Sequence, residues 1–375
     1  MYTRIHQNTI LQALKPNFVV VLYGARRTGK TVLLNSVREV LGQEQVLMVN
    51  GEDLEAARLL SSQKLSVLER FVKGYKYLFI DEAQTIPDIG KNLKLMVDMI
   101  PGLHILISGS SALELYGMTG EPLTGRSLFL RLFPLAQMEL EENMLEMKRK
   151  LEDRLIFGWY PQVVNASNDQ EKVEILQSVK NGYLLKDILV LDNLKDALFV
   201  LDLLRLIAFQ ICSDISYSEL ARQLGVNVRT VQRYLDILEK TFVIFSLRGF
   251  SRNLRKEISM SPRYYFWDNG IRNTIISSYG DLNTRNDIGQ LWENFCISER
   301  MKWQQYNRLY YNNYFWRTYD QQEIDLIEEH GEALHAYEFK WINRKAKIPV
   351  AFRQAYNNIT FEVITHENYY DFIGV

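Results

Sequence analysis

Residues 24–31 read GARRTGKT and follow the apolar run FVVVLY, and this segment constrains the fold more than any other part of the chain. It fits the pattern GxxxxGK[ST], in which a strand passes through a glycine-rich loop into a helix. The glycines let the main chain curl so that its N–H groups face phosphate oxygens, and the helix adds the positive end of its dipole. The residues expected to cradle phosphate are Gly24, Ala25, Arg26, Arg27, Thr28, Gly29, Lys30 and Thr31.

A second acidic motif completes such a site. The apolar run YLFI ends in Asp81 and Glu82. We expect Lys30 to reach the β- and γ-phosphates, and Thr31 and Asp81 to hold Mg²⁺. Glu82 would polarise the attacking water. The sequence has no Asn-Lys-x-Asp motif for reading guanine, which favours adenine, so the expected cofactors are ATP and Mg²⁺.

Two further residues are candidates for the same chemistry. Ser108 ends the apolar run HILIS, with Ser110 and Ser111 just after it, and it either contacts the γ-phosphate or the water, or only forms a turn. Arg126 lies in the glycine-flanked turn LTGR. An arginine in such a turn can stabilise charge on the transferred phosphoryl group, from the same chain or from a neighbouring subunit. A simple surface arginine is equally compatible with the pattern.

The distribution of apolar runs and amphipathic segments along the chain predicts three domains. Up to residue 138, the apolar runs FVVVLYG, QVLMVNG, YKYLFID and HILISGS alternate with amphipathic segments. Continuous apolar strands of this kind are typical of a parallel sheet that is buried on both faces, so we expect an α/β P-loop ATPase domain over 1–138. A helical segment with a winged helix-turn-helix would occupy 139–285, and an α+β domain 286–375.

The segment SYSELARQLGVNVRTVQRYLDILEK predicts the helix-turn-helix. A first helix over 218–224, a turn at Gly225 and a second helix over 227–240 would share an apolar face, and FVIFSLRGF would form a wing strand. The residues that would then read a major groove are Arg229, Thr230, Gln232 and Arg233. Further cations surround them at Arg222, Arg248, Arg252, Arg255 and Lys256. The other interpretation is a structural or protein-docking module.

Near the C-terminus, AYEFKW places Glu338 and Lys340 two residues apart on a predicted strand, so that their side chains share a face. Asp325 lies on the preceding predicted strand and Glu293 on a predicted helix. This order resembles the PD-(D/E)xK fold of restriction-endonuclease-like nucleases. There the carboxylates bind Mg²⁺, which polarises a scissile phosphate, and the lysine stabilises the developing negative charge. An ordinary charge pattern, or an intact fold without activity, would look the same.

Taken together, the motifs resemble the predicted AAA+-type ATPases of bacteria and archaea that carry a C-terminal domain of unknown function. The matching segments are YGARRTGKT, FIDEAQ, ILISGSSALEL, LTGRSLFLRLFPLAQMEL, GWYPQVV and SPRYYFWDNGIRN, so the resemblance covers nearly the whole chain. It implies that Arg126 is a finger or sensor arginine. It also implies a nuclease-like C-terminal domain, often without demonstrated activity.

Composition limits the partners. The 375 residues are 47% hydrophobic and 24% charged with a net charge of −1, so any contact with double-stranded DNA requires a local basic patch. Cys212 and Cys296 lack CxxC spacing, and no apolar run reaches membrane-spanning length, so we expect buried thiols, no membrane contact and a cytoplasmic protein. Two functions remain open. The first is ATP hydrolysis coupled to a DNA- or partner-engaging, nuclease-like part, in a chain that can form oligomers. The second is a nucleotide-switched scaffold that binds protein.

Overall fold

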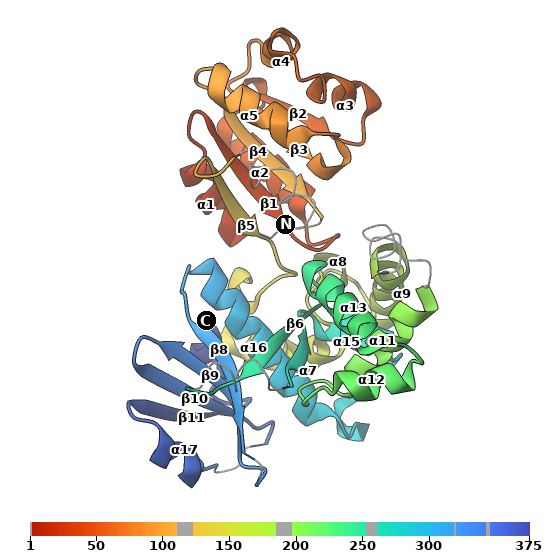
Figure 1. Cartoon of the computed structure of the whole chain (residues 1–375), viewed down its shortest axis with the longest axis vertical. Helices are drawn as coiled ribbons and strands as arrows, with labels where there is room; N and C mark the ends of the chain where they lie inside the picture. Colours follow the sequence, from red (N-terminus) through yellow and green to blue (C-terminus); the bar gives the residue numbers. More distant parts are fainter. Residues whose placement is uncertain (1, 111–122, 185–196, 253–260, 319, 343–345) are drawn as a thin grey trace. The chain divides into compact units, whose positions relative to one another are not determined.

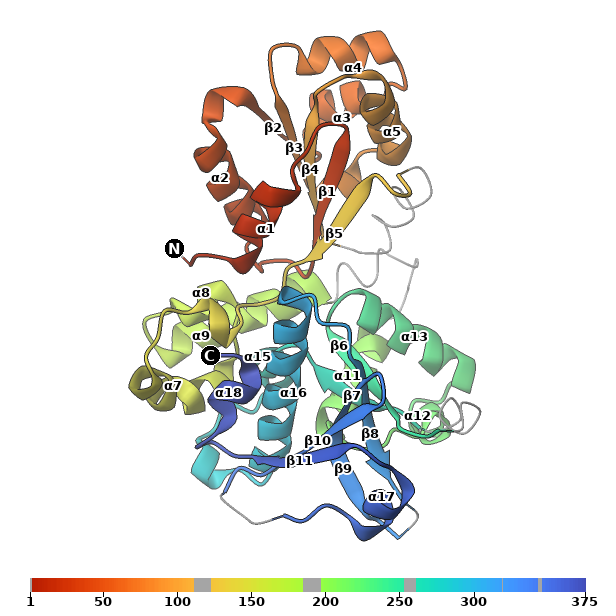
Figure 2. The same ribbon diagram turned by 90° about the vertical axis from the view of Figure 1, so that its left-hand side faces the viewer.

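The computed structural model describes residues 2–110, 123–184, 197–252, 261–318, 320–342 and 346–375. The chain forms two compact units, Met1–Pro134 and Leu135–Val375, and each has its own sheet (Figures 1 and 2). Across the described ranges, no helix combines the length and the apolar character that crossing a membrane requires.

The first unit is built on a five-stranded parallel sheet in the order β2-β3-β4-β1-β5. Its strands are β1 (Phe18–Tyr23), β2 (Val46–Asn50), β3 (Tyr77–Asp81), β4 (His104–Gly109) and β5 (Ser127–Arg131). The first four are the apolar runs from which we predicted a buried parallel sheet, and this prediction is confirmed.

Helices cover both faces of this sheet, as Figure 2 shows. Because successive strand residues face opposite sides, Val20 packs against α1 and α2, whereas Val19 faces the cluster that contains α3, α4 and α5. The helices are α1 (Ile5–Ala13), α2 (Lys30–Leu41), α3 (Leu54–Leu60), α4 (Leu65–Val72) and α5 (Ile89–Met99). The central strands β1, β3 and β4 are therefore largely buried on both faces, whereas the edge strands β2 and β5 are partly exposed.

The second unit combines a helical part with a mixed sheet. Its helices are α7 (Met144–Phe157), α8 (Pro161–Val164), α9 (Asp169–Val179), α11 (Ala197–Phe209), α12 (Tyr217–Gln223), α13 (Val228–Lys240), α15 (Asn269–Ile275), α16 (Ile288–Tyr306), α17 (Val350–Ala355) and α18 (Tyr369–Ile373). Its strands are β6 (Ile244–Gly249), β7 (Arg263–Phe266), β8 (Asn312–Arg317), β9 (Glu323–His330), β10 (Ala333–Phe339) and β11 (Ile359–Ile364). The strand order is β11-β10-β9-β8-β6-β7.

Two helices pack on opposite faces of this sheet. Ala336 of β10 packs with Phe352 of α17, while the next residue, Tyr337, contacts Glu328, which pairs with Arg300 of α16. The register between β8 and β9 shifts between Tyr314 and Trp316, and a bulge of this kind re-aims side chains.

The sheet also includes β6, the segment that we predicted as a wing strand. β6 pairs antiparallel with β7, as a wing strand would, but its far end pairs in parallel with β8 through Arg248 and Gly249. Strands from both sides of residue 285 therefore share one sheet. The three-domain division stays a prediction, whereas the contacts of the chain distinguish two units.

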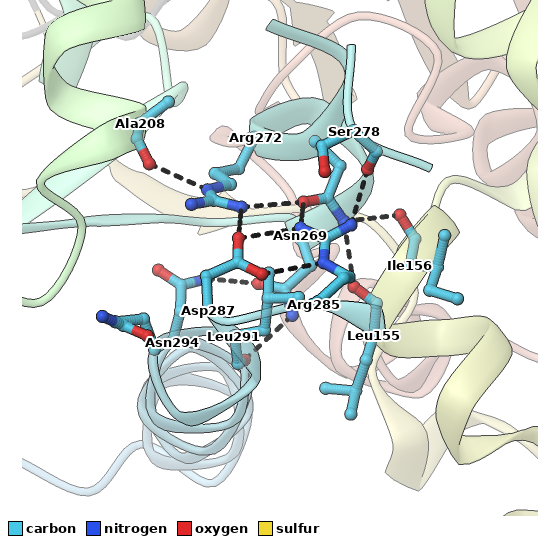
Figure 3. A network of polar contacts seen from close by, with 12 residues as sticks. Leu155, Ile156, Ala208, Asn269, Arg272, Ser278, Arg285, Asp287, Leu291 and Asn294 are labelled. Carbon is cyan, nitrogen blue, oxygen red and sulfur yellow. Dashed lines mark hydrogen bonds and ion pairs between the residues drawn. The ribbon is translucent and has the colours of Figure 1, made fainter. Parts of the chain in front are cut away.

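A polar network fixes the helical part of the second unit to α16, as Figure 3 shows. Asp287, which precedes α16, accepts hydrogen bonds from Arg272 and Arg285 at 2.5 and 2.8 Å. Although burial opposes its ionisation, the hydrogen bonds from these two guanidinium groups lower the pKa of Asp287 to about 2. Arg272 also binds the carbonyl of Ala208 in α11. The network thus links α11, α15 and α16.

Candidate functional site

The phosphate-type loop lies between β1 and α2, and two glycines shape it. At Gly24 a Cβ atom would lie 2.1 Å from the carbonyl oxygen of Leu132, so no other residue fits there without a shift of the main chain. Gly29 has φ of +99° and caps the N-terminus of α2. The strand, loop and helix that the motif requires are therefore all in place, with the positive end of α2 at the loop.

Lys30 bends back over the loop. Its Nζ donates to the carbonyls of Gly24 at 2.9 Å and Ala25 at 3.0 Å, and the residue is only 5% exposed. A buried ammonium group needs acceptors, and the loop itself supplies them here. The hydroxyl of Thr28 also bonds inward, to the carbonyl of Ala25 at 2.8 Å.

Asp81 lies at the centre of a hydrogen-bonded chain at the strand ends. Its Oδ2 accepts from the hydroxyl of Thr31 at 2.6 Å, and its Oδ1 accepts from Ser108. Ser108 in turn accepts from the backbone N–H of Glu82 at 3.2 Å. The structure therefore brings the first turn of α2, the end of β3 and the end of β4 together. Ligands of open α/β sheets bind outside these carboxyl ends.

Glu82 stands in a left-handed conformation, with φ of 51°. Such a backbone costs free energy in a residue other than glycine, and it is common at functional sites. Its carboxylate accepts from Nε2 of Gln84 at 2.5 Å, and the same nitrogen lies 3.2 Å from the hydroxyl of Ser110. The sequence pattern assigns no role to Gln84, although this residue belongs to FIDEAQ, the segment that contains Asp81 and Glu82. Ser111 lies outside the described residues.

Arg126 is not brought to this site. It precedes β5, and its carbonyl accepts from Val19 near the start of β1, at the amino edge of the parallel sheet. The loop begins at the other edge, after Tyr23, which is four strand residues or about 13 Å beyond Val19. The side chain is 52% exposed and pairs with Asp98. Action of Arg126 on the loop of its own chain is therefore inconsistent with the register of the sheet.

The helix-turn-helix residues lie on one exposed face. α12 and α13 form as predicted, capped by Ser216 and Asn227. Arg229, Gln232 and Arg233 are exposed on α13, while Val231, Tyr234 and Leu235 are buried. Because positions three and four apart share a helix face, the three polar side chains form a single surface. Thr230 is only partly exposed, since its backbone and hydroxyl bond to Asn227. Arg255 and Lys256 lie outside the described residues.

The four C-terminal residues converge, but each is already engaged. Asp325 accepts from the backbone N–H of Phe339 at 2.9 Å, and Glu338 accepts from Lys340 at 2.6 Å. Glu293 accepts from the hydroxyl of Tyr265 at 3.1 Å. These carboxylates do not make the predicted metal site: in the described parts of the chain, no three His, Cys, Asp or Glu side chains form a group that could hold a metal ion.

Burial and neighbouring charges shift the pKa values of these residues. Burial, together with the charge of Asp325, raises the pKa of Glu293 well above its usual range. Burial and the charge of Glu338 raise the pKa of Asp325 to about 7. Lys340 loses hydration, but its bond to Glu338 outweighs that loss and raises its pKa. Without a cation, burial and the repulsion between these carboxylates therefore favour the protonated forms of Glu293 and Asp325.

Family models match three successive parts of the chain. Residues 16–141 match the model described as an AAA domain. Residues 148–281 and 288–371 match two domains of unknown function (DUF8612 and DUF4143). The N-terminal part thus matches an AAA domain model over the segment that carries the P-loop motif, in line with the resemblance noted from the sequence. The winged-helix and nuclease-like assignments receive no such match and stay predictions.

Relatives extend over most of the chain. An uncharacterized protein of Haemophilus influenzae is 26% identical over 291 residues, which cover 72% of this chain and 72% of the relative. An uncharacterized protein of Mycobacterium tuberculosis is 28% identical over 327 residues, with 86% and 70% covered. A solved RuvB mutant of Thermotoga maritima aligns with 18% identity and a TM-score of 0.28, covering 66% of this chain and 87% of that chain.

Proposed function

We propose that the chain binds and hydrolyses ATP with Mg²⁺ at the carboxyl ends of β1, β3 and β4. The observation that carries this proposal is the hydrogen-bonded chain from Thr31 through Asp81 to Ser108 beside the glycine loop. The match of residues 16–141 to an AAA domain supports the same class of activity. Turnover would drive the second unit, which engages DNA or a protein partner.

The chain supplies suitable groups for the nucleotide and the metal. Lys30 would exchange its bonds to the loop carbonyls for phosphate oxygens, which are stronger, charged acceptors. The hydroxyl of Thr31 and the carboxylate of Asp81 are hard oxygen donors that already reach one another, so both fit Mg²⁺. The metal would neutralise charge on the β- and γ-phosphates. The proposed phosphate cradle remains residues 24–31.

Glu82 is the proposed base, and Gln84 would hold its carboxylate in place. Ser108 would fix Asp81 and the Glu82 backbone, because its hydroxyl bonds to both. Arg126, at the far edge of the sheet, would act only across a subunit boundary, on the site of a second copy of the chain.

The test is ATP hydrolysis by the full chain with and without Mg²⁺. Replacing Lys30→Ala should abolish tight nucleotide binding, whereas Glu82→Gln should keep binding and lower kcat by about 10²–10⁴, the usual contribution of a positioned base. Lys91→Ala, at an exposed surface ion pair with Asp88, serves as the matched control. Full activity of Glu82→Gln would refute the assigned base, and no nucleotide affinity in the wild type would refute the whole proposal.

We also propose that α13 contacts double-stranded DNA, because Arg229, Gln232 and Arg233 share one exposed face behind a tight turn. The winged-helix interpretation rests on this turn and on the β6–β7 hairpin pairing. For the C-terminal cluster we propose engagement of a partner without cutting. The engaged carboxylates of Glu293, Asp325 and Glu338 support this choice, and so does the absence of a metal-competent group among the described side chains.

A nucleotide-switched scaffold that binds only protein is the remaining alternative. It differs from the first function in one measurable respect, since DNA should neither bind to the chain nor alter its ATP turnover. A titration of duplex DNA into the ATPase assay at low salt separates the two functions.

A further inference from the structure

The chain passes from one compact unit to the other at Pro134, and a buried cation holds the carbonyl on each side of that residue. Within the first unit, Nη2 of Arg4 donates to the carbonyl of Phe133 at 2.8 Å. Within the second, Nζ of Lys302 donates to the carbonyl of Leu135 at 3.1 Å. Arg4 is 6% exposed and Lys302 is 0% exposed. Buried cations of this kind are costly to leave without acceptors.

The other terminal nitrogen of Arg4 contacts the phosphate-type loop. Its Nη1 donates to the carbonyl of Thr28 at 2.6 Å. One planar guanidinium group therefore bridges the loop and the last residues of the first unit, a geometry that the rigid fork of arginine favours and lysine cannot reproduce. The loop meets the same segment a second time at Gly24, where only the missing Cβ leaves room for the carbonyl of Leu132.

In the second unit, Lys302 and Glu299 hold the residues that follow Pro134. Lys302 pairs with Glu299 at 2.6 Å, and the other oxygen of Glu299 accepts from the backbone N–H of Gln137 at 2.7 Å. The N–H of Leu135 bonds to the carbonyl of Trp159 at 2.9 Å. Pro134 itself has no N–H to donate and a fixed φ. The residues on each side of Pro134 are thus held by contacts within their own unit.

We infer that Arg4 is a positioning residue that transmits nucleotide occupancy of the loop to the junction at Pro134. The inference rests on the proposed ATP site. When phosphate draws Lys30 off the carbonyls of Gly24 and Ala25, the loop main chain rearranges, and the carbonyl of Thr28 moves with it. Arg4 carries that displacement to Phe133, and the Lys302–Glu299 pair receives it on α16. By linkage, the state of the junction then alters nucleotide affinity by the same factor.

The experiment is amide hydrogen exchange of residues 132–137 in the full chain, with and without a non-hydrolysable ATP analogue. Nucleotide affinity is measured in parallel with a fluorescent ATP analogue. In the wild type, the analogue should change exchange in this segment by about tenfold, the size expected for one charge-assisted hydrogen bond. Arg4→Met should still bind the analogue but lose this response. Arg4→Lys, which keeps the charge but can reach only one carbonyl, should lose it as well.

The matched control alters the second-unit side of the junction and leaves the phosphate-type loop unchanged. Lys302→Met combined with Glu299→Gln removes both charges, so neither is left buried and unpaired. It should still bind the analogue, with the response at residues 135–137 lost and that at 132–133 kept. If the wild type binds no nucleotide, the proposed ATP site fails. If it binds and Arg4→Met or Arg4→Lys retains the full response, this inference fails and the ATP site stands. Should Arg4→Met not fold, Arg4→Lys alone decides between these results.

Discussion

The hydroxyl of Thr31 donates to the carboxylate of Asp81 at 2.6 Å, and this contact ties the first turn of α2 to the end of β3. Fifty residues separate the two in sequence, so only the parallel order of β3, β4 and β1 brings them together. The pair defines where a metal would meet the phosphates, and the first prediction follows from it.

Replacing Thr31→Val should remove the Mg²⁺-dependent part of ATP affinity, because valine keeps the shape but lacks the oxygen. We expect the ratio of affinities with and without Mg²⁺ to fall by about tenfold or more, as for loss of a hydrogen bond to a charged group. Titration of a fluorescent ATP analogue measures it. Thr31→Ser retains the hydroxyl and should behave as the wild type, and equal ratios for valine and serine would contradict the assignment.

Gln84→Leu should lower kcat for ATP by about tenfold and leave KM unchanged. The variant removes the 2.5 Å contact that fixes the Glu82 carboxylate, and loss of orientation acts on the transition state more than on binding. Steady-state kinetics at saturating Mg²⁺ tests this expectation. A rise in KM at constant kcat would show that Gln84 contacts substrate instead.

The double change Arg229→Ala with Arg233→Ala should weaken duplex DNA binding and reduce the slope of log K against log salt by about 2, since each phosphate contact contributes about 1. Electrophoretic or fluorescence titration at several salt concentrations gives the slope. Arg205→Ala removes another exposed arginine, one that pairs with Asp202 on α11, and should leave the slope unchanged. An unaltered slope in the double variant would move the proposal to protein docking.

The wild type should not nick plasmid DNA with Mg²⁺ or Mn²⁺, and Asp325→Ala should match it. The reason is that Asp325 and Glu338 are engaged by Phe339 and Lys340, and that no metal-competent group occurs among the described side chains. Gel analysis of supercoiled plasmid over a range of metal concentrations makes the comparison. Metal-dependent nicking by the wild type that Asp325→Ala abolishes would restore the nuclease interpretation.

Asp268 predicts a pH effect on stability. Burial raises the pKa of Asp268 to about 6, although backbone N–H groups such as that of Trp159 hydrogen-bond to its carboxylate. A raised pKa means that the native state binds the proton more tightly. The stability this provides is complete below about pH 4 and is lost as pH rises through 6. The wild type should therefore lose on the order of 3 kcal/mol relative to Asp268→Asn between pH 4 and pH 7. Urea unfolding followed by tryptophan fluorescence at each pH measures this difference, and a constant difference would contradict the prediction.

Local features of the chain were predictable from sequence. The glycine loop, the strand that ends at Asp81 and the two helices around Gly225 follow from short-range rules of apolar periodicity, caps and turns. The placement of Thr31 beside Asp81 follows as well, because parallel strands share their carboxyl edge.

Long-range contacts were not predictable in this way. Arg4 binds carbonyls 24 and 129 residues away, and no spacing rule reports such a bond. The parallel pairing of β6 with β8 is of the same kind. The position of Arg126 is also of this kind, because β5, which follows it, is not among the four strands that the apolar runs predicted. The C-terminal carboxylates were expected to share a site, but the pattern does not encode their hydrogen-bond partners, such as Tyr265 for Glu293.

The pairing of β6 with β8 has a consequence for how this chain can be inherited. A gene fragment that began at residue 286 would encode β8 without the strand that covers its outer edge, and an open edge invites aggregation. A fragment that began at residue 135 would keep every strand of that sheet and both contacts that hold its first residues, from Lys302 to the carbonyl of Leu135 and from the N–H of Gln137 to Glu299. Recombination should therefore exchange residues 1–134 as one module and keep residues 135–375 together.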